Sequence, residues 1–384
     1  MKHLFSLLTV ALLFSLCAPK AHADVLTSEQ EKRLALYGIA FYNLENLFDT
    51  IHDAGKNDYE FLPTGSYKWN GHKYRSKLKN MARVLSELCT QVGKSRNPAG
   101  AAVIGISEVE NRHVVEDLLQ QDALRDRGYQ IAHIDGPDRR GVECGFLYNP
   151  RLFHHQQTML VPYYYLSDKQ PEVDLGFYVD EQGKVRAYDN FLRGDTTHIT
   201  RGFLVMSGTM AGEKMHFIVC HWPSRAAASP ARERAGYQVR HLKEALQRQD
   251  PGCHIIIMGD MNDDPNNPSM NSPECLGCKH TKEETGEDDL YNPWWDTLYK
   301  VGQGSLLYNG KWNLFDQIVF TGNLLGTDRS SLKFLRHDIF LRDYLMQQEG
   351  RYKGGPLRTT AGGTWLNGYS DHLPTQIYLV KELQ

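Results

Sequence analysis

The sequence predicts an α/β protein in which two mainly antiparallel sheets pack together and helices cover their outer faces. Apolar segments of strand length alternate irregularly with only a few helical segments. Many neighbouring strand candidates are joined in a way that is typical of hairpins. No internal repeat and no clean linker divides the 384 residues. This combination favours one domain built from two sheets with external helices.

The individual elements follow from the spacing of apolar residues. Strands are expected at residues 36–42, 101–106, 129–134, 142–148, 156–165, 202–209, 215–220, 255–258, 312–320 and 375–381. Helices are expected near 74–93, 113–125 and 230–248, and the first of these has apolar residues at helical spacing. Residues 49–70 are predicted to form a long surface loop, and residues near 266–293 a loop insertion.

The first 23 residues have the pattern of a secretory signal peptide. Lys2 provides a basic start, the apolar run that ends at Leu16 is too short to span a bilayer, and Ala23 ends a small-x-small cleavage site. A lipoprotein attached through Cys17 is the alternative, which the large Leu16 disfavours. We therefore expect residues 24–384 to form a single exported domain, periplasmic or secreted, with no transmembrane segment.

The charge of the chain limits the classes of partner. The sequence has 43 Lys and Arg residues against 46 Asp and Glu residues, a net charge of −3. Removal of residues 1–23 takes away Lys2 and Lys20 and no acid, which leaves 41 basic residues and a net charge of −5. A broad electrostatic footprint for polynucleotide is not supported, although a local basic cleft is compatible with these numbers. Nothing in the sequence implies a stable protein partner.

Six of the seven cysteines lie after the signal peptide. Cys275 and Cys278 form a C-x-x-C in a polar loop, which in an exported protein favours a small disulfide. Zinc is the alternative, because His280 is close by in the sequence. The remaining four lie in or beside apolar segments and are expected to be buried: Cys89, Cys144, Cys220 and Cys253.

Polar side chains that can do chemistry follow the predicted strands at their ends. The clearest example is the run IIIM, which is followed by Asp260 and Asn262, two residues apart and so on one side of an extended chain. Each such residue alone has a structural explanation, such as a helix cap, a turn residue or a surface histidine. Six such strand ends drawn from the whole chain indicate a site. The other five carry Asn43, Glu108, His221, Asp316 and the pair Asp371–His372.

The residue types in this set narrow the chemistry. Carboxylates and amides suit Mg²⁺, with Mn²⁺ or Ca²⁺ as alternatives, better than zinc. A hard cation beside histidines suits attack on a phosphate ester, because the metal neutralises phosphoryl oxygens while a His–Asp pair transfers protons. His221 and His372 are flanked by polar residues and a nearby proline. We therefore expect their replacement to cost little stability.

Six motifs, in this order, resemble the endonuclease/exonuclease/phosphatase superfamily: NLENLFD, ISEVEN, CHWPSR, MGDMND, FDQIVF and YSDHLP. This superfamily includes pancreatic-type deoxyribonucleases, abasic-site endonucleases, bacterial sphingomyelinases and inositol polyphosphate 5-phosphatases. The resemblance covers nearly all of the chain after residue 23, and MGDMN together with SDH is its most specific part. It implies a four-layer α/β/β/α sandwich of the deoxyribonuclease I type, with the site at one end of the two sheets, in an exported bacterial member.

The resemblance also implies a metal site. Glu108 matches the main metal ligand, and Asn43 lies beside it. Glu45 falls where some members place a second metal-binding carboxylate. Asp371 is a further residue that the resemblance places at the metal.

The remaining motif positions imply catalytic roles. Asp260 and Asn262 would orient the attacking water and bind the phosphate, and Asp316 would pair with His372. His221 would hydrogen-bond the phosphate or protonate the leaving oxygen, as in the deoxyribonuclease and sphingomyelinase branches. The abasic-site branch lacks this histidine, so His221 and the signal peptide both argue against a repair enzyme. Glu143 is the candidate carboxylate to orient His221.

We expect an exported Mg²⁺-dependent phosphodiesterase, with an endonuclease acting on nucleic acid favoured over enzymes for other phosphate esters. Arg140, Arg201 and Arg225 would supply positive charge for the phosphate. The alternative hydrolase is a phosphatase or an enzyme for phospholipid head groups or inositol phosphates. A non-catalytic binding protein on the same fold is a remote alternative. Four tryptophans in loops are candidates to touch bases or a lipid surface: Trp69, Trp222, Trp294 and Trp295.

Overall fold

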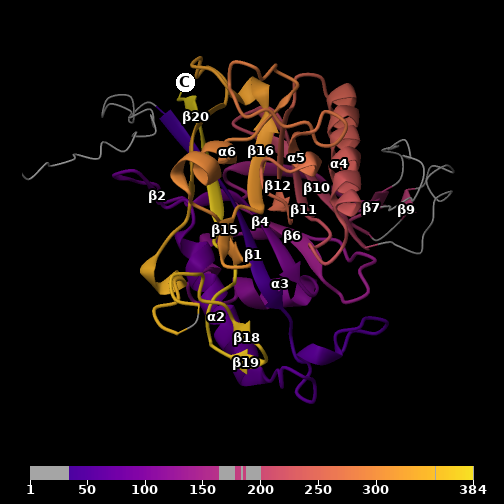
Figure 1. The fold of residues 1–384 in the computed structure, drawn as a ribbon. Coiled ribbons are helices and arrows are strands. Elements are labelled where there is room, and N and C mark those ends of the chain that lie inside the picture. Colours follow the sequence, from indigo (N-terminus) through magenta and orange to yellow (C-terminus); the bar gives the residue numbers. More distant parts are fainter. Residues whose placement is uncertain (1–33, 164–177, 183–184, 187–199, 351, 384) are drawn as a thin grey trace, which may run out of the picture.

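The computed structural model describes residues 34–163, 178–182, 185–186, 200–350 and 352–383. The expected signal peptide, residues 1–23 with Cys17, lies outside these residues. The described chain is a mixed α/β fold with two large sheets, as the sequence predicts (Figure 1). In the described residues, no helix combines the length and the apolar character that a membrane crossing requires.

The first sheet has six strands. Its central strands β1 and β4 run parallel, and its other described pairs are antiparallel. The C-terminal strand pairs with β1, so that Leu34 lies opposite Glu382. Across the sheet the strands are β17 (Lys333–Ile339), β20 (Thr375–Glu382), β1 (Leu34–Leu47), β4 (Ala101–Val109), β6 (Glu143–Tyr148) and β5 (Gln130–Ala132).

The second sheet has eight strands, and only β11 and β12 are parallel among its described pairs. Across the sheet the strands are β13 (Leu290–Tyr291), β16 (Asp316–Thr321), β12 (His254–Asp260), β11 (Glu213–His221), β10 (Thr200–Met210), β7 (Phe153–Tyr163), β8 (Tyr178–Asp180) and β9 (Val185–Arg186). Three small hairpins lie outside the large sheets: β2 (Gln91–Val92) with β3 (Ser95–Arg96), β14 (Leu306–Tyr308) with β15 (Lys311–Asn313), and β18 (Thr360–Ala361) with β19 (Thr364–Trp365).

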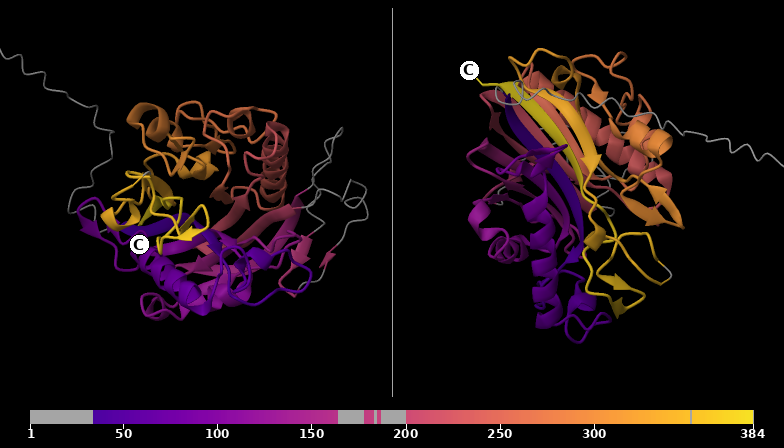
Figure 2. Two further views of the ribbon diagram at one scale, coloured as in Figure 1. Left: turned by 60° about the horizontal axis from the view of Figure 1, so that its bottom comes forward. Right: turned by 90° about the vertical axis from the view of Figure 1, so that its left-hand side faces the viewer.

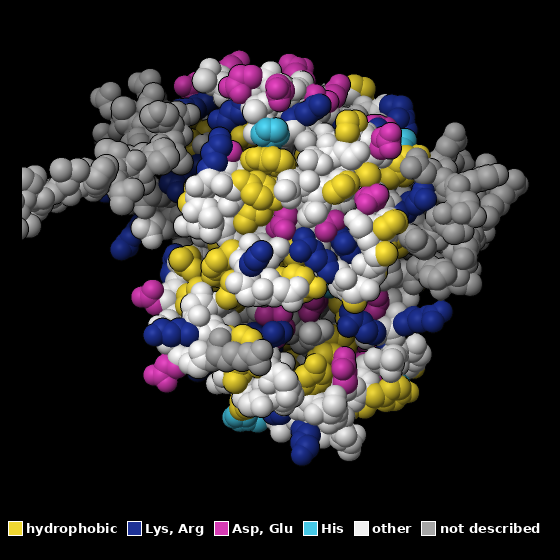
Figure 3. All heavy atoms as spheres, in the orientation of Figure 1, with side chains coloured by type: hydrophobic (Ala, Val, Ile, Leu, Met, Phe, Trp, Pro, Cys, Tyr) yellow, Lys and Arg dark blue, Asp and Glu magenta, His cyan; other side chains and the backbone are white. Residues whose placement is uncertain are grey.

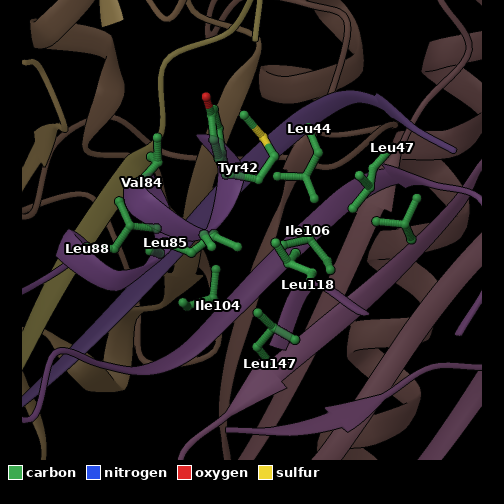
Figure 4. Close-up of a cluster of buried hydrophobic side chains, with 14 of the residues drawn as sticks. Tyr42, Leu44, Leu47, Val84, Leu85, Leu88, Ile104, Ile106, Leu118 and Leu147 are labelled. Atoms are coloured by element: carbon green, nitrogen blue, oxygen red, sulfur yellow. The ribbon is translucent and has the colours of Figure 1, made fainter. Parts of the chain in front are cut away.

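Three apolar cores separate four layers. Ile104 and Ile106 of β4 face helices α2 (Gly71–Glu87) and α3 (Arg112–Leu119), as Figure 4 shows. Val103, one position away, faces the core between the two sheets, as the two-residue period of a strand requires. The second sheet packs its outer face on α4 (Ser229–Gln249) and the short α5 (Pro268–Asn271). Figure 2 shows the sheets face to face with helices on both outer sides.

Two predicted helices end earlier than the apolar spacing suggests. The helix expected near 74–93 ends at Glu87, because Cys89 has a left-handed backbone (φ 55°) and donates its N–H to Gln376 on the neighbouring strand. The chain then enters the β2–β3 hairpin. The helix expected near 113–125 ends at Leu119. In the first case a tertiary contact overrides a periodic pattern that continues past the helix end.

The 266–293 segment is packed rather than a free loop. It contains α5, it adds β13 to the edge of the second sheet, and Met270 and Leu276 are buried against α4. The expected disulfide is wrong, because Cys275 and Cys278 are both buried free thiols in this structure. The zinc alternative gains no support either, since no group of clustered ligand atoms among the described residues includes them.

Most of the tryptophans expected at the surface are core residues. Trp69, Trp222 and Trp294 are buried, and Trp69 donates its indole N–H to the Phe48 carbonyl at 2.8 Å. Trp295 is half-buried and stacks on His280. Loops that close over the edges of a sandwich bury large aromatic residues, so that three of the four are unavailable to a base or a lipid.

Candidate active site

The polar strand ends meet at one end of the sandwich. In the second sheet, Asp260 lies opposite His221 on one side and opposite Asp316 on the other. In the first sheet, Asn43 of β1 pairs with Ser107 of β4, and Ser107 is the residue that precedes Glu108. The Asn43 side chain links the sheets, because its Nδ2 donates to Glu108 Oε1 and to Asp260 Oδ2, both at 3.0 Å.

Irregular backbone turns the Glu108 carboxylate into this position. The β1–β4 register shifts after Asn43, and the β4–β6 register shifts at Glu108. Glu45, Asn46 and Glu108 have φ values of 48°, 57° and 61°. This left-handed region is uncommon for residues other than glycine, and such strain concentrates at functional sites. The result is that Glu108 Oε2 also accepts the Asn46 backbone N–H at 3.0 Å.

Asp260 is buried beneath the site and ordered on both oxygens. Its Oδ2 accepts from Asn43, and its Oδ1 accepts the Asn262 backbone N–H at 2.9 Å. Asn262 is also left-handed (φ 50°), and its Nδ2 donates to the Trp222 carbonyl at 3.1 Å. The pKa of Asp260 is raised to about 7, mainly by burial; Asp316 and Glu108 act in the same direction, and His372 opposes them.

His372 forms an ion pair with Asp316. Its Nδ1 lies 2.7 Å from Asp316 Oδ2, which also accepts the Ser305 hydroxyl. Its Nε2 lies 3.8 Å from Asp260 Oδ2 and 4.0 Å from Asp371 Oδ1. Burial lowers the pKa of His372, but Asp316 and Asp260 outweigh burial and hold it well above its usual range. The imidazole is therefore a cation at neutral pH.

His221 has the opposite character. Its Nε2 lies 3.7 Å from both Glu108 Oε1 and Asp260 Oδ2. Its Nδ1 is buried with no hydrogen-bond partner among the described residues. Burial lowers the pKa of His221 well below 6.5, and the cations of Arg201, Arg140 and His372 lower it further. The imidazole is therefore neutral at pH 7.

The sequence suggested that Glu143 would orient His221, but Glu143 does not lie against it. Its carboxylate contacts Lys56 Nζ at 3.4 Å, and Lys56 also donates to the carbonyls of Gly136 and Asp138. Burial raises the pKa of Glu143 to about 8. The ion pair instead fastens the 49–70 loop to the turn that precedes β6.

Two of the three predicted phosphate arginines are already engaged. Arg201 is buried, and it donates to Asp138 Oδ2 and to the His221 carbonyl, both at 3.0 Å. Arg225 donates to the Asn262 carbonyl at 3.1 Å and forms an ion pair with Asp264 at 3.2 Å. These side chains hold the backbones of His221 and Asn262. Arg140 is exposed.

Glu45 and Asp371 lie apart from the clustered Glu108 ligand atoms. Arg358 donates to Glu45 Oε1 at 3.3 Å and to Asp371 Oδ2 at 2.8 Å. The other Glu45 oxygen accepts the Thr359 backbone N–H at 2.6 Å. The pKa of Glu45 is raised to about 7, mainly by burial and in part by Asp371. The buried Lys77 lies close by and donates to the Tyr369 carbonyl at 2.5 Å.

Sequence reasoning missed Ser305, Lys77 and Arg358. Lys77 had a detectable signal, because it occupies the apolar face of α2 between Tyr74 and Met81. Ser305 and Arg358 lie in loops without periodicity, where no local pattern marks them.

The donor set fits a divalent cation. Potential ligand atoms gather in two groups, and within each group these atoms lie within 4.8 Å of one another. The groups are Glu108–His221–Asp260 and Asp260–Asp316–His372. Three carboxylates near one another at a site with a single histidine cation repel one another, and a bound cation relieves that repulsion. Carboxylate and amide oxygens suit hard cations.

Comparison with known proteins identifies the family. The sequence profile of the Endonuclease/Exonuclease/phosphatase family matches residues 38–174 and 163–381. The chain belongs to this family. Its members are phosphoesterases that depend on a divalent metal, which agrees with the clustered carboxylates and histidines. A search of curated proteins found no match.

Two solved structures with TM-scores of at least 0.50 show the same fold at low sequence identity, and a third is similar with a lower score. A Bacteroides thetaiotaomicron endonuclease/exonuclease/phosphatase family protein is 15% identical, with 92% of this chain and 100% of that chain covered and a TM-score of 0.50. ANGEL2, described as a 2′,3′-cyclic phosphatase, is 13% identical, with 91% and 96% covered and a TM-score of 0.51. A Bacteroides thetaiotaomicron mannosyl-6-phosphatase is 15% identical, with 89% and 99% covered and a TM-score of 0.47.

Proposed function

We propose that this chain is an exported, divalent-metal-dependent phosphodiesterase that acts as an endonuclease on nucleic acid. The observation that carries the proposal is the junction of the two sheets. There Glu108 and Asp260 both accept hydrogen bonds from Asn43, directly beside the Asp316–His372 ion pair. The proposal of export rests on the sequence of residues 1–23.

Glu108 and Asp260 would hold the metal, with Asn43 beside them as the donor that positions both carboxylates. Mg²⁺ is the first choice, and Mn²⁺ or Ca²⁺ are alternatives. A bound divalent cation neutralises the phosphoryl oxygens and activates a water. The Asn43 amide fixes the distance between the two carboxylates. Asn262, held by Asp260 and by the Trp222 carbonyl, would help to orient the substrate phosphate.

The proton-transfer roles follow from pKa values that the environment pushes apart. Asp260 would orient the attacking water by accepting a hydrogen bond from it. His372 is protonated beside Asp316 and is suited to stabilise the phosphoryl charge or to donate a proton. His221 is neutral, so that it serves as a hydrogen-bond donor to the phosphate rather than as a cation.

The surface supports an anionic substrate. Figure 3 shows a hollow below the centre of this face, with Asp and Glu side chains in its depth and Lys and Arg side chains around its edge. An acidic floor suits a metal, and a basic edge suits a phosphodiester chain.

A phosphatase, or an enzyme for phospholipid head groups or inositol phosphates, is the second candidate. The buried Trp69, Trp222 and Trp294 favour it, because they remove side chains on which bases would stack. A non-catalytic binding protein is a remote candidate, and the perturbed pKa values of Asp260 and His372 argue against it.

Two neighbouring glutamates test the proposal. Purified mature protein is incubated with plasmid DNA, RNA, sphingomyelin and inositol phosphates, in Mg²⁺ and in EDTA. We expect hydrolysis of nucleic acid only with metal, and a loss of about 10²-fold or more in Glu108→Gln. Glu110→Gln is the matched control, because Glu110 is buried two residues away and its carboxylate accepts the Asp49 N–H instead. Full activity of metal-stripped protein in EDTA would refute the proposal.

Export has a separate test. Cell fractionation followed by N-terminal sequencing should give a periplasmic or secreted chain that begins after Ala23. A cytosolic chain that still begins at Met1 would contradict this part of the proposal.

A further inference from the structure

Two charge clusters lie side by side at the candidate site, and their balances differ. The first contains the carboxylates of Glu108, Asp260 and Asp316, which lie close together with His221 and His372. Among the described residues, no lysine or arginine forms an ion pair with these three carboxylates, whose ion-pair partners are the two histidines. A divalent cation would therefore meet carboxylates that no fixed arginine or lysine already engages.

The second cluster already contains fixed cations. It contains the carboxylates of Glu45 and Asp371 and the cations of Arg358 and Lys77. Arg358 bridges the two carboxylates directly, with contacts of 3.3 Å to Glu45 and 2.8 Å to Asp371. Lys77 holds the adjoining Thr359 hydroxyl and Tyr369 carbonyl from beneath.

The two clusters adjoin at Asp371. Asp371 Oδ2 faces Arg358, while its Oδ1 lies 4.0 Å from His372 Nε2 in the first cluster. Metals in two-metal phosphoesterases lie about 3.5–4 Å apart and share such carboxylates. In this chain both Glu45 oxygens already accept hydrogen bonds, one from the Arg358 guanidinium and one from the Thr359 backbone N–H. One Asp371 oxygen also accepts from the guanidinium.

We propose that the Arg358 guanidinium takes the place of a second metal ion, so that the chain binds a single divalent cation at the Glu108 cluster. This inference rests on the proposed metal-dependent function. Arg358 is fixed by two carboxylates and carries its charge at any pH at which the protein is folded. A built-in cation of this kind makes Glu45 and Asp371 holders of Arg358 rather than metal ligands.

Mn²⁺ binding to the metal-stripped full chain tests the proposal, measured by isothermal titration calorimetry and by the loss of the free Mn²⁺ signal in electron paramagnetic resonance. We expect one site in the wild type. Arg358→Met releases two carboxylates and should add a second, weaker site. Arg358→Met with Asp371→Asn should return the count to one. Arg342→Met is the matched control, since Arg342 lies in the same part of the chain and pairs with Glu87; it should keep one site.

A further variant keeps the test decisive if Arg358→Met does not fold. Asp371→Asn in the wild-type background should leave Mn²⁺ affinity within about threefold, because Asp371 is not a ligand in this scheme. Two sites in the wild type, or a loss of more than tenfold in Asp371→Asn, would overturn the inference. A folded Arg358→Met variant with one site would also overturn it. A wild type that binds no Mn²⁺ would refute the proposed function itself.

Discussion

The Asp316–His372 pair offers the sharpest test of the site, through three variants: His372→Ala, Asp316→Asn and the double variant. Asp316 is fully buried, and within the described part of the chain its side-chain donors are His372 and Ser305. Each single variant should lower turnover by about 10²–10⁴-fold, the usual worth of a positioned acid or base. Because Asp316 acts through His372, the double variant should lie within about tenfold of the worse single variant.

Stability gives a second, independent measurement of the same pair. The sequence led us to expect little loss of stability from replacing His372, but the structure buries it against a buried carboxylate. His372→Ala leaves the Asp316 charge uncompensated, which should cost about 3–5 kcal/mol of unfolding free energy at pH 7. The double variant should recover about 1–3 kcal/mol of this, because the asparagine side chain that replaces Asp316 is neutral and still accepts from Ser305.

The pH dependence has a defined sign. The pKa of His372 is raised in the folded protein, mainly by Asp316 and Asp260 acting against burial. The pair therefore contributes stability fully below the unfolded pKa of about 6.5, and this contribution is lost as pH rises through the folded pKa. Urea unfolding from pH 6 to 10 and steady-state kinetics measure both effects. Turnover losses that multiply in the double variant, or stability losses that simply add, would refute a pair that works as a unit.

Two further predictions concern residues away from the reacting groups. Glu213 accepts hydrogen bonds from His254 and Lys381, which outweigh burial and lower its pKa to about 2. Its stabilisation is present above pH 4.5 and lost as pH falls toward 2, so Glu213→Gln should cost about 1–3 kcal/mol at pH 7 and flatten acid unfolding below pH 4.5, measured by circular dichroism with Glu116→Gln as control. The double variant Cys275→Ala/Cys278→Ala should keep turnover within about threefold and lower Tm, because both thiols are buried and lie outside the ligand clusters. A turnover loss of orders of magnitude in a folded double variant would show that the site extends into this segment.

The functional residues at the strand ends could be predicted from the sequence, because buried strand positions are apolar while the site residues that follow them are polar. Ile255 and Ile257 fill the space between sheet and helix, Ile256 and Met258 fill the space between the two sheets, and the strand then ends in the polar Asp260. The same contrast identifies Glu108 near the end of β4 and His221 at the end of β11. This contrast lies within one strand, so it can be recognised in a single sequence without knowing which residues contact that strand in the fold.

The contact partners of individual residues and the irregularities of the backbone cannot be predicted from such a local pattern. Cys89 continues the apolar spacing of α2, yet Gln376 of a distant strand accepts its N–H and the helix has already ended. Glu143 was the candidate carboxylate to orient His221, but its carboxylate instead contacts Lys56 of the 49–70 loop. Each outcome depends on a residue dozens or hundreds of positions away, which local pattern cannot supply.

The arginines show how this limit affects the chemistry. Arg201 and Arg225 were predicted to supply positive charge for the phosphate, but Asp138 pairs with the first and Asp264 with the second. Their guanidinium groups hold the carbonyls of His221 and Asn262 instead. Of the cations discussed at the site, the exposed Arg140 and the protonated His372 remain to face a substrate, and a bound metal would add further positive charge. Because so few fixed cations remain, binding of an anionic ester should depend on the metal as strongly as its hydrolysis does.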